Sequence, residues 1–386
     1  MTSKLEDLIA ELCPNGVEYK ALSEVSDMKR GTTVTKKSVN PGDIPVISGG
    51  REPAYYCDTS NRNGETITVA GSGAGAGFVQ YWDKPIFVCD AFSVKGIDDL
   101  TLTKFLYYVL LSKQETIYAT KKGGGVPHVH ISSIENFEIP VPPLEVQAEI
   151  VQILDTFTEL TAELTAELTA ELTARKKQYE YYRDTLLTFN DNNPLHSLIS
   201  RYCPNGVEYK KIGDIATLSR GKVMSKSFIN DNSGEYPVYS SQTENNGQFG
   251  AISTYMFDGK YVTWTTDGAN AGTVFYRDGK FSVTNVCGVI DISDCQVDTK
   301  YVYYALTIHA KNYVSSGMGN AKLMSNVMSK VTIPVPPLEV QLQIVQILDH
   351  FDALCNDLTQ GLPAEIEARR KQYEYYRDQL LTFKRA

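Results

Sequence analysis

The sequence has no apolar run of the roughly 20 residues that a membrane span requires. Its cysteines are odd in number, seven, and none forms a Cys-x-x-Cys pair. This argues against a disulfide framework and a zinc site, so no metal ligand is predicted. The first residues, MTSKLEDLIAEL, are amphipathic and acidic, unlike a secretory signal. The sequence therefore predicts free thiols and a cytoplasmic location.

Signatures of catalysis are also missing. There is no Walker A sequence, and no nuclease-like cluster of carboxylates and lysine stands out. The glycine-rich stretch at 70–78 lacks a clean G-x-G-x-x-G, and a strand-like segment follows it instead of a helix. We interpret it as a tight turn between two strands. The Pro-Pro words at 142–143 and 336–337 lack the Asn or Asp and the aromatic residue that an amino-methyltransferase uses to hold its target base. No catalytic residue is predicted.

Composition indicates a packed protein with an acidic balance. The 386 residues are 42% hydrophobic and 22% charged, enough for two or three folded domains. The net charge of −9 argues, taken alone, against a nucleic-acid partner. Much of the acidity falls in segments with a helical pattern, however. Bulk charge therefore leaves a DNA partner open.

The chain is written twice. Long words recur in the same order at separations of 190–194 residues, much longer than the roughly 20–50 residues of a solenoid repeat. Two copies of one unit are therefore predicted, each with a variable body and a nearly constant tail. The repeated words are CPNGVEYK (13–20 and 203–210), IPVPPLEVQ (139–147 and 333–341), IVQILD (150–155 and 344–349) and KQYEYYRD (177–184 and 371–378).

The bodies are predicted to be mixed α/β and mainly β. Short alternating runs are bounded by Gly, Asn and Asp, as in strands joined by turns. IPVPPLE should be extended, because proline disfavours helix, and the words after it show helical spacing. The fold class is α/β (α+β), with two pseudo-symmetric bodies separated by two long antiparallel helices that form a coiled coil. We predict a first body at 1–140, a central helix at 141–190, a second body at 191–334 and a C-terminal helix at 335–386.

The central helix carries Thr-Ala-Glu-Leu (TAEL) repeats without a helix breaker. Leu160, Leu164, Leu168 and Leu172 recur every four residues, so they drift about 40° per step and form an apolar stripe. A similar stripe, Phe351 to Ile366 by way of Leu358, is the predicted partner. Gly361-Leu362-Pro363 should interrupt the second helix. The alternative is that TAEL is helical filler of immaterial length.

This ordered set of words resembles the DNA-specificity subunit of type I restriction-modification enzymes, and the TAEL tract resembles its IC subgroup. The resemblance covers nearly the whole chain. It implies a non-catalytic chain with two target recognition domains, each reading one half of a bipartite double-stranded DNA sequence. It also implies that the helices dock two methyltransferase subunits, and restriction subunits through them. No cofactor is expected in this chain, whereas the partners would use S-adenosylmethionine, ATP and Mg²⁺.

Two other functions are alternatives. A self-contained DNA adenine methyltransferase is opposed by the missing base-holding loop. A coiled-coil adaptor without a DNA role is opposed by the two bodies, which share a frame but differ in their loops.

Candidate DNA contacts follow from side-chain chemistry. Arg, Asn and Gln can pair with base edges, whereas Lys more often meets phosphate. The segment 121–130, KKGGGVPHVH, combines lysines, glycines and two histidines that would share one face of a strand. For any single residue, a solvated turn is an equal alternative. The candidates are Arg30, Lys36, Lys37, Arg51, Arg62, Lys121, Lys122, His128 and His130 in the first body, and Arg220, Lys222, Lys226, Gln242, Asn245, Asn246, Lys311 and Lys322 in the second.

Candidate subunit-docking residues come from the repeated KQYEYYRD word. Tyr and Arg are enriched at interface hot spots. The alternative is that some of these tyrosines seal the helices onto the bodies. The predicted docking residues are Tyr179, Tyr182, Arg183, Tyr373, Tyr376 and Arg377.

Overall fold

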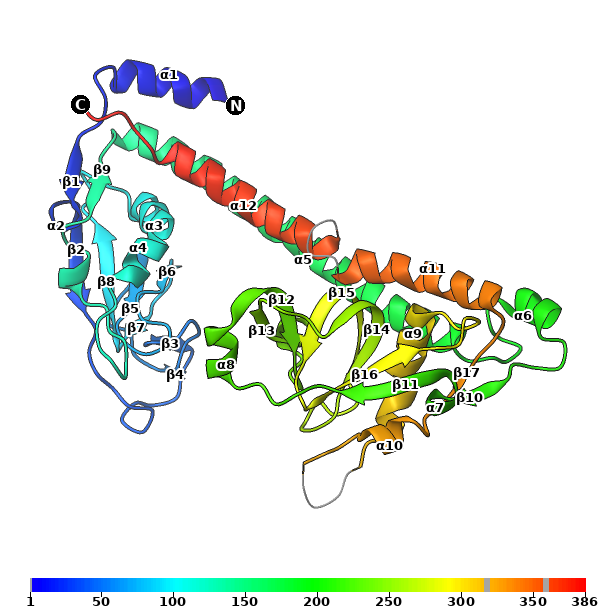
Figure 1. Ribbon diagram of the computed structural model, residues 1–386. Helices are drawn as coiled ribbons and strands as arrows, with labels where there is room; N and C mark the ends of the chain where they lie inside the picture. Colours follow the sequence, from blue (N-terminus) through cyan, green and yellow to red (C-terminus); the bar gives the residue numbers. More distant parts are fainter. Residues whose placement is uncertain (1, 316–319, 357–360) are drawn as a thin grey trace. The chain divides into compact units, whose positions relative to one another are not determined.

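The computed structural model describes residues 2–315, 320–356 and 361–386. The chain forms two compact units, 1–169 with 365–386, and 170–364. Each unit combines one body with parts of the long helices, and α5 (Leu144–Leu186) runs from the first unit into the second (Figure 1). The four segments predicted from the sequence follow one another along the chain. The two compact units are drawn differently, because each one contains a body together with parts of both helical segments.

The first body contains a four-stranded antiparallel sheet in the order β2-β8-β5-β6. A three-stranded sheet, β4-β3-β7, and a β1-β9 pair complete it. Its helices and strands are α1 (Thr2–Leu12), β1 (Tyr19–Ala21), α2 (Leu22–Val25), β2 (Ser26–Arg30), β3 (Ile44–Ile47), β4 (Tyr55–Cys57), β5 (Thr66–Ala70), β6 (Val79–Trp82), β7 (Phe87–Val88), β8 (Ala91–Gly96), α3 (Thr103–Ser112), α4 (Gln114–Ala119) and β9 (Glu138–Pro140).

The second body merges the corresponding strands into one six-stranded sheet, β11-β16-β14-β15-β12-β13. Its β10 and β17 pair as β1 and β9 do. The elements are α6 (His196–Tyr202), β10 (Tyr209–Lys211), α7 (Ile212–Ile215), β11 (Ala216–Arg220), α8 (Lys226–Asp231), β12 (Ser233–Tyr239), β13 (Gln248–Ile252), β14 (Phe257–Thr265), β15 (Val274–Val283), β16 (Cys287–Ile292), α9 (Thr299–His309), α10 (Ser325–Met328) and β17 (Thr332–Pro334), followed by α11 (Leu338–Asn356) and α12 (Leu362–Leu380).

A single proline accounts for part of the difference between the two sheets. In the first body Pro85 lies between β6 and β7, where it cannot donate a ladder hydrogen bond. The aligned residue of the second body is Lys280, and there β15 continues without a break through Val283. The same frame therefore supports two differently connected sheets.

The predicted extended and helical tails are present. The first two residues of each IPVPPLE word end a short strand, β9 or β17. The next helices begin at Leu144 and Leu338. In the first unit Thr158 of α5 bonds to Tyr373 of α12 over 2.9 Å. In the second unit Tyr182 of α5 stacks on Phe351 of α11, with ring centroids 5.1 Å apart. Within each unit α5 and its partner helix run antiparallel, as predicted.

The second long helix is interrupted, as Gly361-Leu362-Pro363 predicted. α11 ends at Asn356, and α12 begins at Leu362 with Pro363 in its first turn. Leu358, part of the predicted partner stripe, lies outside the described residues. The TAEL leucines differ from one another: Leu168 is buried, whereas Leu160 is 56% exposed. This follows from the drift of about 40° per step, which leaves only part of the stripe facing the partner helix.

Each body shares its core with the long helix that follows it. Val146, Ile150 and Leu154 of α5 are fully buried in the first core, and Val340, Ile344 and Leu348 of α11 occupy the same places in the second. Residues four and eight apart lie on one helix face, so the repeated words supply one buried stripe per copy. No helix in the described ranges is long and apolar enough to cross a bilayer.

Candidate nucleic-acid interface

The glycine-rich stretch of the first body is a strand-to-strand turn, as predicted. It joins β5 to its antiparallel neighbour β6, and Gly73 and Gly77 adopt φ of 77° and 83°, which favours glycine. The loop that contains His128 lies along this turn: the Val129 amide donates to the Gly71 carbonyl over 3.0 Å. The turn thus places the predicted 121–130 segment beside the ends of β5 and β8.

This arrangement forms a pocket of about 400 Å³ that collects three predicted residues, Arg30, His128 and His130. The two imidazole rings stack with centroids 5.9 Å apart. Asp90 also lines the pocket, and its carboxylate accepts a hydrogen bond from Ser72 Oγ. The pocket therefore offers one cation, one carboxylate and two imidazoles, which together can meet donors and acceptors on base edges. We call Arg30, His128, His130 and loop 121–127 the first reading surface.

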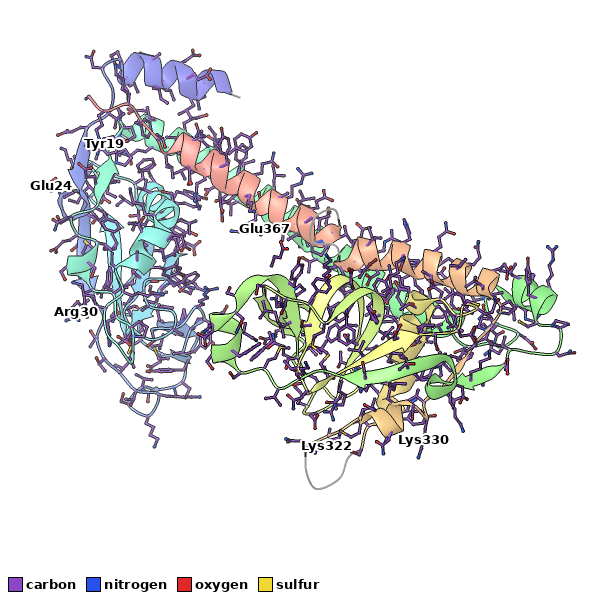
Figure 2. All side chains as sticks on the ribbon, viewed as in Figure 1. Tyr19, Glu24, Arg30, Lys322, Lys330 and Glu367 are labelled. Carbon is purple, nitrogen blue, oxygen red and sulfur yellow. The ribbon has the colours of Figure 1, made fainter. Side chains whose placement is uncertain are left out.

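Gly31, which follows Arg30, also lines this pocket, and there the backbone passes close to Cys89. A Cβ at Gly31 would lie 2.1 Å from the carbonyl oxygen of Cys89, so only glycine allows the chain to pass there. Within the first unit, β1 begins near α5 at Tyr19, and Arg30 lies toward the opposite end of the body (Figure 2). The pocket that Arg30 lines is therefore at a distance from the end of the body where β1 meets α5.

Lys121 and Lys122 border the same loop. The Lys121 ammonium lies 4.1 Å from the Tyr118 ring centroid, a cation–π contact. Lys122 is exposed, and its backbone pairs with that of His128 in both directions, at 3.0 and 2.8 Å. Gly124 and Gly125 lie in the loop between Lys122 and His128, and a Cβ added at either glycine would meet no atom within 4 Å. The loop thus leaves room for both lysines to approach a phosphate.

The other first-body candidates do not line that pocket. Lys36 and Lys37 are exposed in a turn. Arg51 is exposed and lies over the Phe78 ring at 5.1 Å. Arg62 is different, because its guanidinium donates to Ser93 Oγ over 2.7 Å and to the carbonyls of neighbouring residues. Of the first-body candidates, Arg62 has the fewest free donors for a ligand.

The second body fills the equivalent region with charge pairs. Arg220 occupies the place of Arg30, and Lys322 that of His128. The carboxylate of Asp267 forms ion pairs with both cations, at 3.7 Å from Arg220 and 3.8 Å from Lys322. Lys322 lies on the side of this unit remote from α11 (Figure 2). The frame is thus shared, while the groups offered to a ligand differ.

The remaining second-body candidates are spread over loops and short helices. Lys222, Lys226 and Lys311 are exposed. Gln242 uses its amide to bond the Gln248 carbonyl. Asn245 and Asn246 are exposed in a turn, Glu244–Gly247, with φ of 48° and 52°. Part of the predicted glycine loop near Lys322, at 316–319, lies outside the described residues.

The predicted docking tyrosines divide into inward and outward groups. Tyr179 and Tyr182 pack against the second core, and burial raises the pKa of Tyr179. Tyr373 is half-buried and bonded to Thr158, whereas Tyr376 is 46% exposed. Two tyrosines outside the predicted set, Tyr181 and Tyr375, are more exposed. The alternative role, sealing the helices onto the bodies, therefore fits Tyr179 and Tyr182 better than a docking role.

The two arginines of that word are held within their own helices. Arg183 pairs with Asp184 at 2.7 Å, and Arg377, which is buried, pairs with Asp378 at 2.8 Å. Beside the first pair of helices, a groove of about 220 Å³ is lined by apolar and polar groups of α5 and α12. Its lining residues are Phe157, Leu160, Thr161, Leu164, Arg369, Gln372, Tyr373 and Tyr376.

Two residues with clear structural roles were not predicted from the sequence. Gln147 is fully buried and bonds to three backbone groups, at Leu102, Leu100 and Pro142. Gln341 makes the same set of bonds, to Asp298, Gln296 and Pro336. The signal was available, because both glutamines end the repeated word IPVPPLEVQ. A repeated polar residue in a buried stripe indicates a fixed internal contact.

Comparison with known proteins identifies a family that shares this sequence arrangement. A family model described as the type I restriction modification DNA specificity domain matches residues 14–174 and again residues 204–368. The type I restriction enzyme MpnII specificity subunit of Mycoplasma pneumoniae is 38% identical over 310 residues, covering 67% of this chain and 92% of that protein. S.HindORF215P of Haemophilus influenzae, named as a putative type I restriction enzyme specificity subunit, is 33% identical over 390 residues, covering 95% and 96%.

Solved structures share the fold. The S subunit of a type I restriction-modification system from M. genitalium matches with a TM-score of 0.53 at 19% identity, covering 95% of this chain and 97% of that one. A chain from a structure on complex assembly and conformational transition of the type I restriction-modification system matches with a TM-score of 0.60 at 17% identity, covering 95% and 98%. Both comparisons span nearly the whole of each chain.

Proposed function

This chain belongs to the type I restriction-modification DNA specificity family, and we propose that its two bodies each read one half of a bipartite double-stranded DNA target. As a specificity subunit it supplies sequence specificity and is the non-catalytic component of its system. A DNA adenine methyltransferase complete in one chain, and an adaptor without a DNA role, are not favoured by this membership.

One observation carries the proposal: buried polar contacts are repeated in the two units, whereas the groups offered to a ligand differ between the two bodies. Gln147 and Gln341 make matching sets of backbone bonds in the two units. In contrast, His128 of the first reading surface is replaced by Lys322, and the uncharged Ser72 by Asp267. Two readers of different sequences need a common frame and different contact groups.

The helices are proposed to hold the two readers at a set spacing and to dock two methyltransferase subunits. The exposed aromatic residues Tyr181, Tyr375 and Tyr376 lie on these helices and support this part. Restriction subunits would join through the methyltransferases. S-adenosylmethionine, ATP and Mg²⁺ would be used by those partners and not by this chain. The proposal includes a cytoplasmic location, where such a complex meets the chromosome.

Mapping of methylated adenines by sequencing, in cells that carry the complete system, tests the proposal. The expected pattern is two short specified blocks separated by an unspecified spacer. Purified alone, the chain should transfer no methyl group to DNA. A single uninterrupted target, or methyl transfer by the chain without partners, would contradict the proposal.

A further inference from the structure

A turn in the second body has a backbone conformation that the family match does not explain. Among the described residues, only two that are not glycine have positive φ, and they are adjacent: Asn245 (φ 48°, ψ 45°) and Asn246 (φ 52°, ψ 31°). Gly247 follows with φ of 77°. Two successive left-handed residues are typical of type I′ turns, where Asn, Asp and Gly are favoured, and this segment joins the antiparallel strands β12 and β13. Here a third left-handed residue, Gly247, extends the turn. Such a turn persists when its surroundings hold it.

The side chain of Arg277, on β15, is hydrogen-bonded to this turn. Its Nη2 donates to the Asn246 carbonyl over 2.8 Å, and its Nε donates to Thr263 Oγ1 over 3.1 Å. A Cβ at Gly247 would lie 3.1 Å from the same Nη2. The guanidinium also lies over the Tyr239 ring, with Cζ 3.5 Å from its centroid. The side chain is thus fixed between the sheet and the turn.

This buried cation is unusual in its partners. Arg277 is 3% exposed, and no carboxylate in the described part of the chain pairs with it. Its Nη1 is buried and makes no hydrogen bond to the described residues. Burial lowers the pKa of the Arg277 guanidinium, while the neighbouring Tyr239 raises it. Burying an unpaired guanidinium is unfavourable, so the residue is not explained by stability alone.

The first body shows that the sheet does not need an arginine here. Trp82 occupies the aligned position, and its Nε1 donates to Thr68 over 2.9 Å, where Thr68 aligns with Thr263. An uncharged indole thus makes the same contact to the sheet. Beyond this contact, the arginine adds cation–π contacts to the Tyr239 and Phe275 rings and the Nη2 bond to the carbonyl of Asn246.

The turn presents two unused carboxamides. Asn245 and Asn246 are exposed, and neither side chain bonds to another described residue. A carboxamide carries a donor and an acceptor side by side, which matches the N6 and N7 groups of adenine in the major groove. Held rigidly, such a pair gives up less side-chain and backbone freedom on binding.

We propose that Arg277 is a positioning residue for DNA reading, which fixes the Asn245–Asn246 turn so that its carboxamides meet a base edge in the second half-site. This rests on the proposed function of the two bodies. Arg277 acts through the turn and does not itself contact the base. The first half-site, read by the other body, is independent of it.

Methylation mapping with Arg277→Met in the complete complex tests this. We expect an unchanged first half-site and relaxed preference at one or two positions of the second, where discrimination falls by about tenfold. Arg277→Lys, which keeps a donor cation, should restore part of it. A purely structural role would reduce methylation at all targets equally and leave every base preference unchanged. That outcome would overturn the proposal.

Two further variants provide a control and a substitute for Arg277→Met. Trp82→Phe removes the matching bond to Thr68 in the first body and should leave the second half-site unaffected. If Arg277→Met does not fold, Asn246→Asp serves instead, because Asp also tolerates the left-handed region. An unchanged second half-site in Asn246→Asp would refute the inference. A wild-type pattern without two half-sites would instead refute the proposed function itself.

Discussion

The hydroxyl of Tyr108 donates to the carboxylate of Asp155 over 2.6 Å, joining α3 of the first body to α5. The second unit repeats this bond, with Tyr304 donating to Asp349 over 2.6 Å. Burial and the carboxylate raise the pKa of both tyrosines, so each stays a donor. The final Asp of the repeated word IVQILD therefore attaches each body to its long helix.

Replacing that carboxylate should destabilise the unit that holds it. Asp155→Asn weakens the bonds from Tyr108 and from Lys104, which lies 2.7 Å away. Because the aspartate is partly exposed, we expect a loss of about 1–2 kcal/mol, with a similar loss in Asp349→Asn. Urea unfolding measures it. Glu163→Gln, at an exposed site of the same helix, is the control and should change the free energy of unfolding little. If Asp155→Asn changed it no more than this control, the Tyr108–Asp155 bond would not stabilise the unit.

The length of α5 should set the spacer between half-sites. Deleting Thr169–Leu172 shortens the helix by about 6 Å and rotates the residues beyond it by about 40°. One base pair of B-DNA advances about 3.4 Å and about 34–36°. Methylation mapping should therefore show both half-sites retained, with a spacer altered by about one or two base pairs. Glu167→Ala keeps the length and should keep the spacer. A deletion variant with the original spacer would show that TAEL is only filler.

Lys121 and Lys122 should contribute charge to DNA binding. If both meet phosphate, the double change to Ala weakens binding and reduces the slope of log K against log salt by about one for each phosphate that is no longer neutralised. Binding titrations of the assembled complex at several salt concentrations measure this slope. Lys95→Ala removes an exposed charge from β8 and serves as the control. A slope equal to that of the control would remove the two lysines from the interface.

His309 should make the second unit sensitive to mild acid. Burial lowers the pKa of its imidazole below 6.5, and its Nε2 has no hydrogen-bond partner among the described residues. The unfolded chain therefore binds a proton before the folded one does, and stability falls as the pH drops through about 6.5 and below. In thermal unfolding, His309→Gln should lose less stability than the wild type between pH values of about 7.5 and about 5.5. His350→Gln, at an exposed site, should behave like the wild type, and an identical profile for His309→Gln would exclude the effect.

Much of the fold was predictable because its signals are local or repeated. The extended IPVPPLE words, the helices after them, the turn at 70–78 and the break at Gly361 all follow from proline, glycine and helical spacing within a few residues. The candidate sites were less predictable. Arg30, His128 and His130 meet in one pocket, but Arg62, of the same residue type as Arg30, uses its donors inside the body.

The tyrosines of the KQYEYYRD word show the same limit. Tyr179 and Tyr181 are two residues apart in one helix, yet the first packs on a core and the second is 64% exposed. Helical spacing separates the two faces, but which face meets a neighbour depends on elements distant in the chain. Exposure of a given side chain is therefore not a local property.

By itself, the sequence determined that there are two copies of one unit, where each helical tail begins, and that the copies differ in their loops, since repetition and backbone preference are written in order along the chain. Only the tertiary structure decided which charged groups are free. Arg277 lies 31 residues from the turn that it holds, and such a contact depends on how strands pack, which neighbouring residues do not encode.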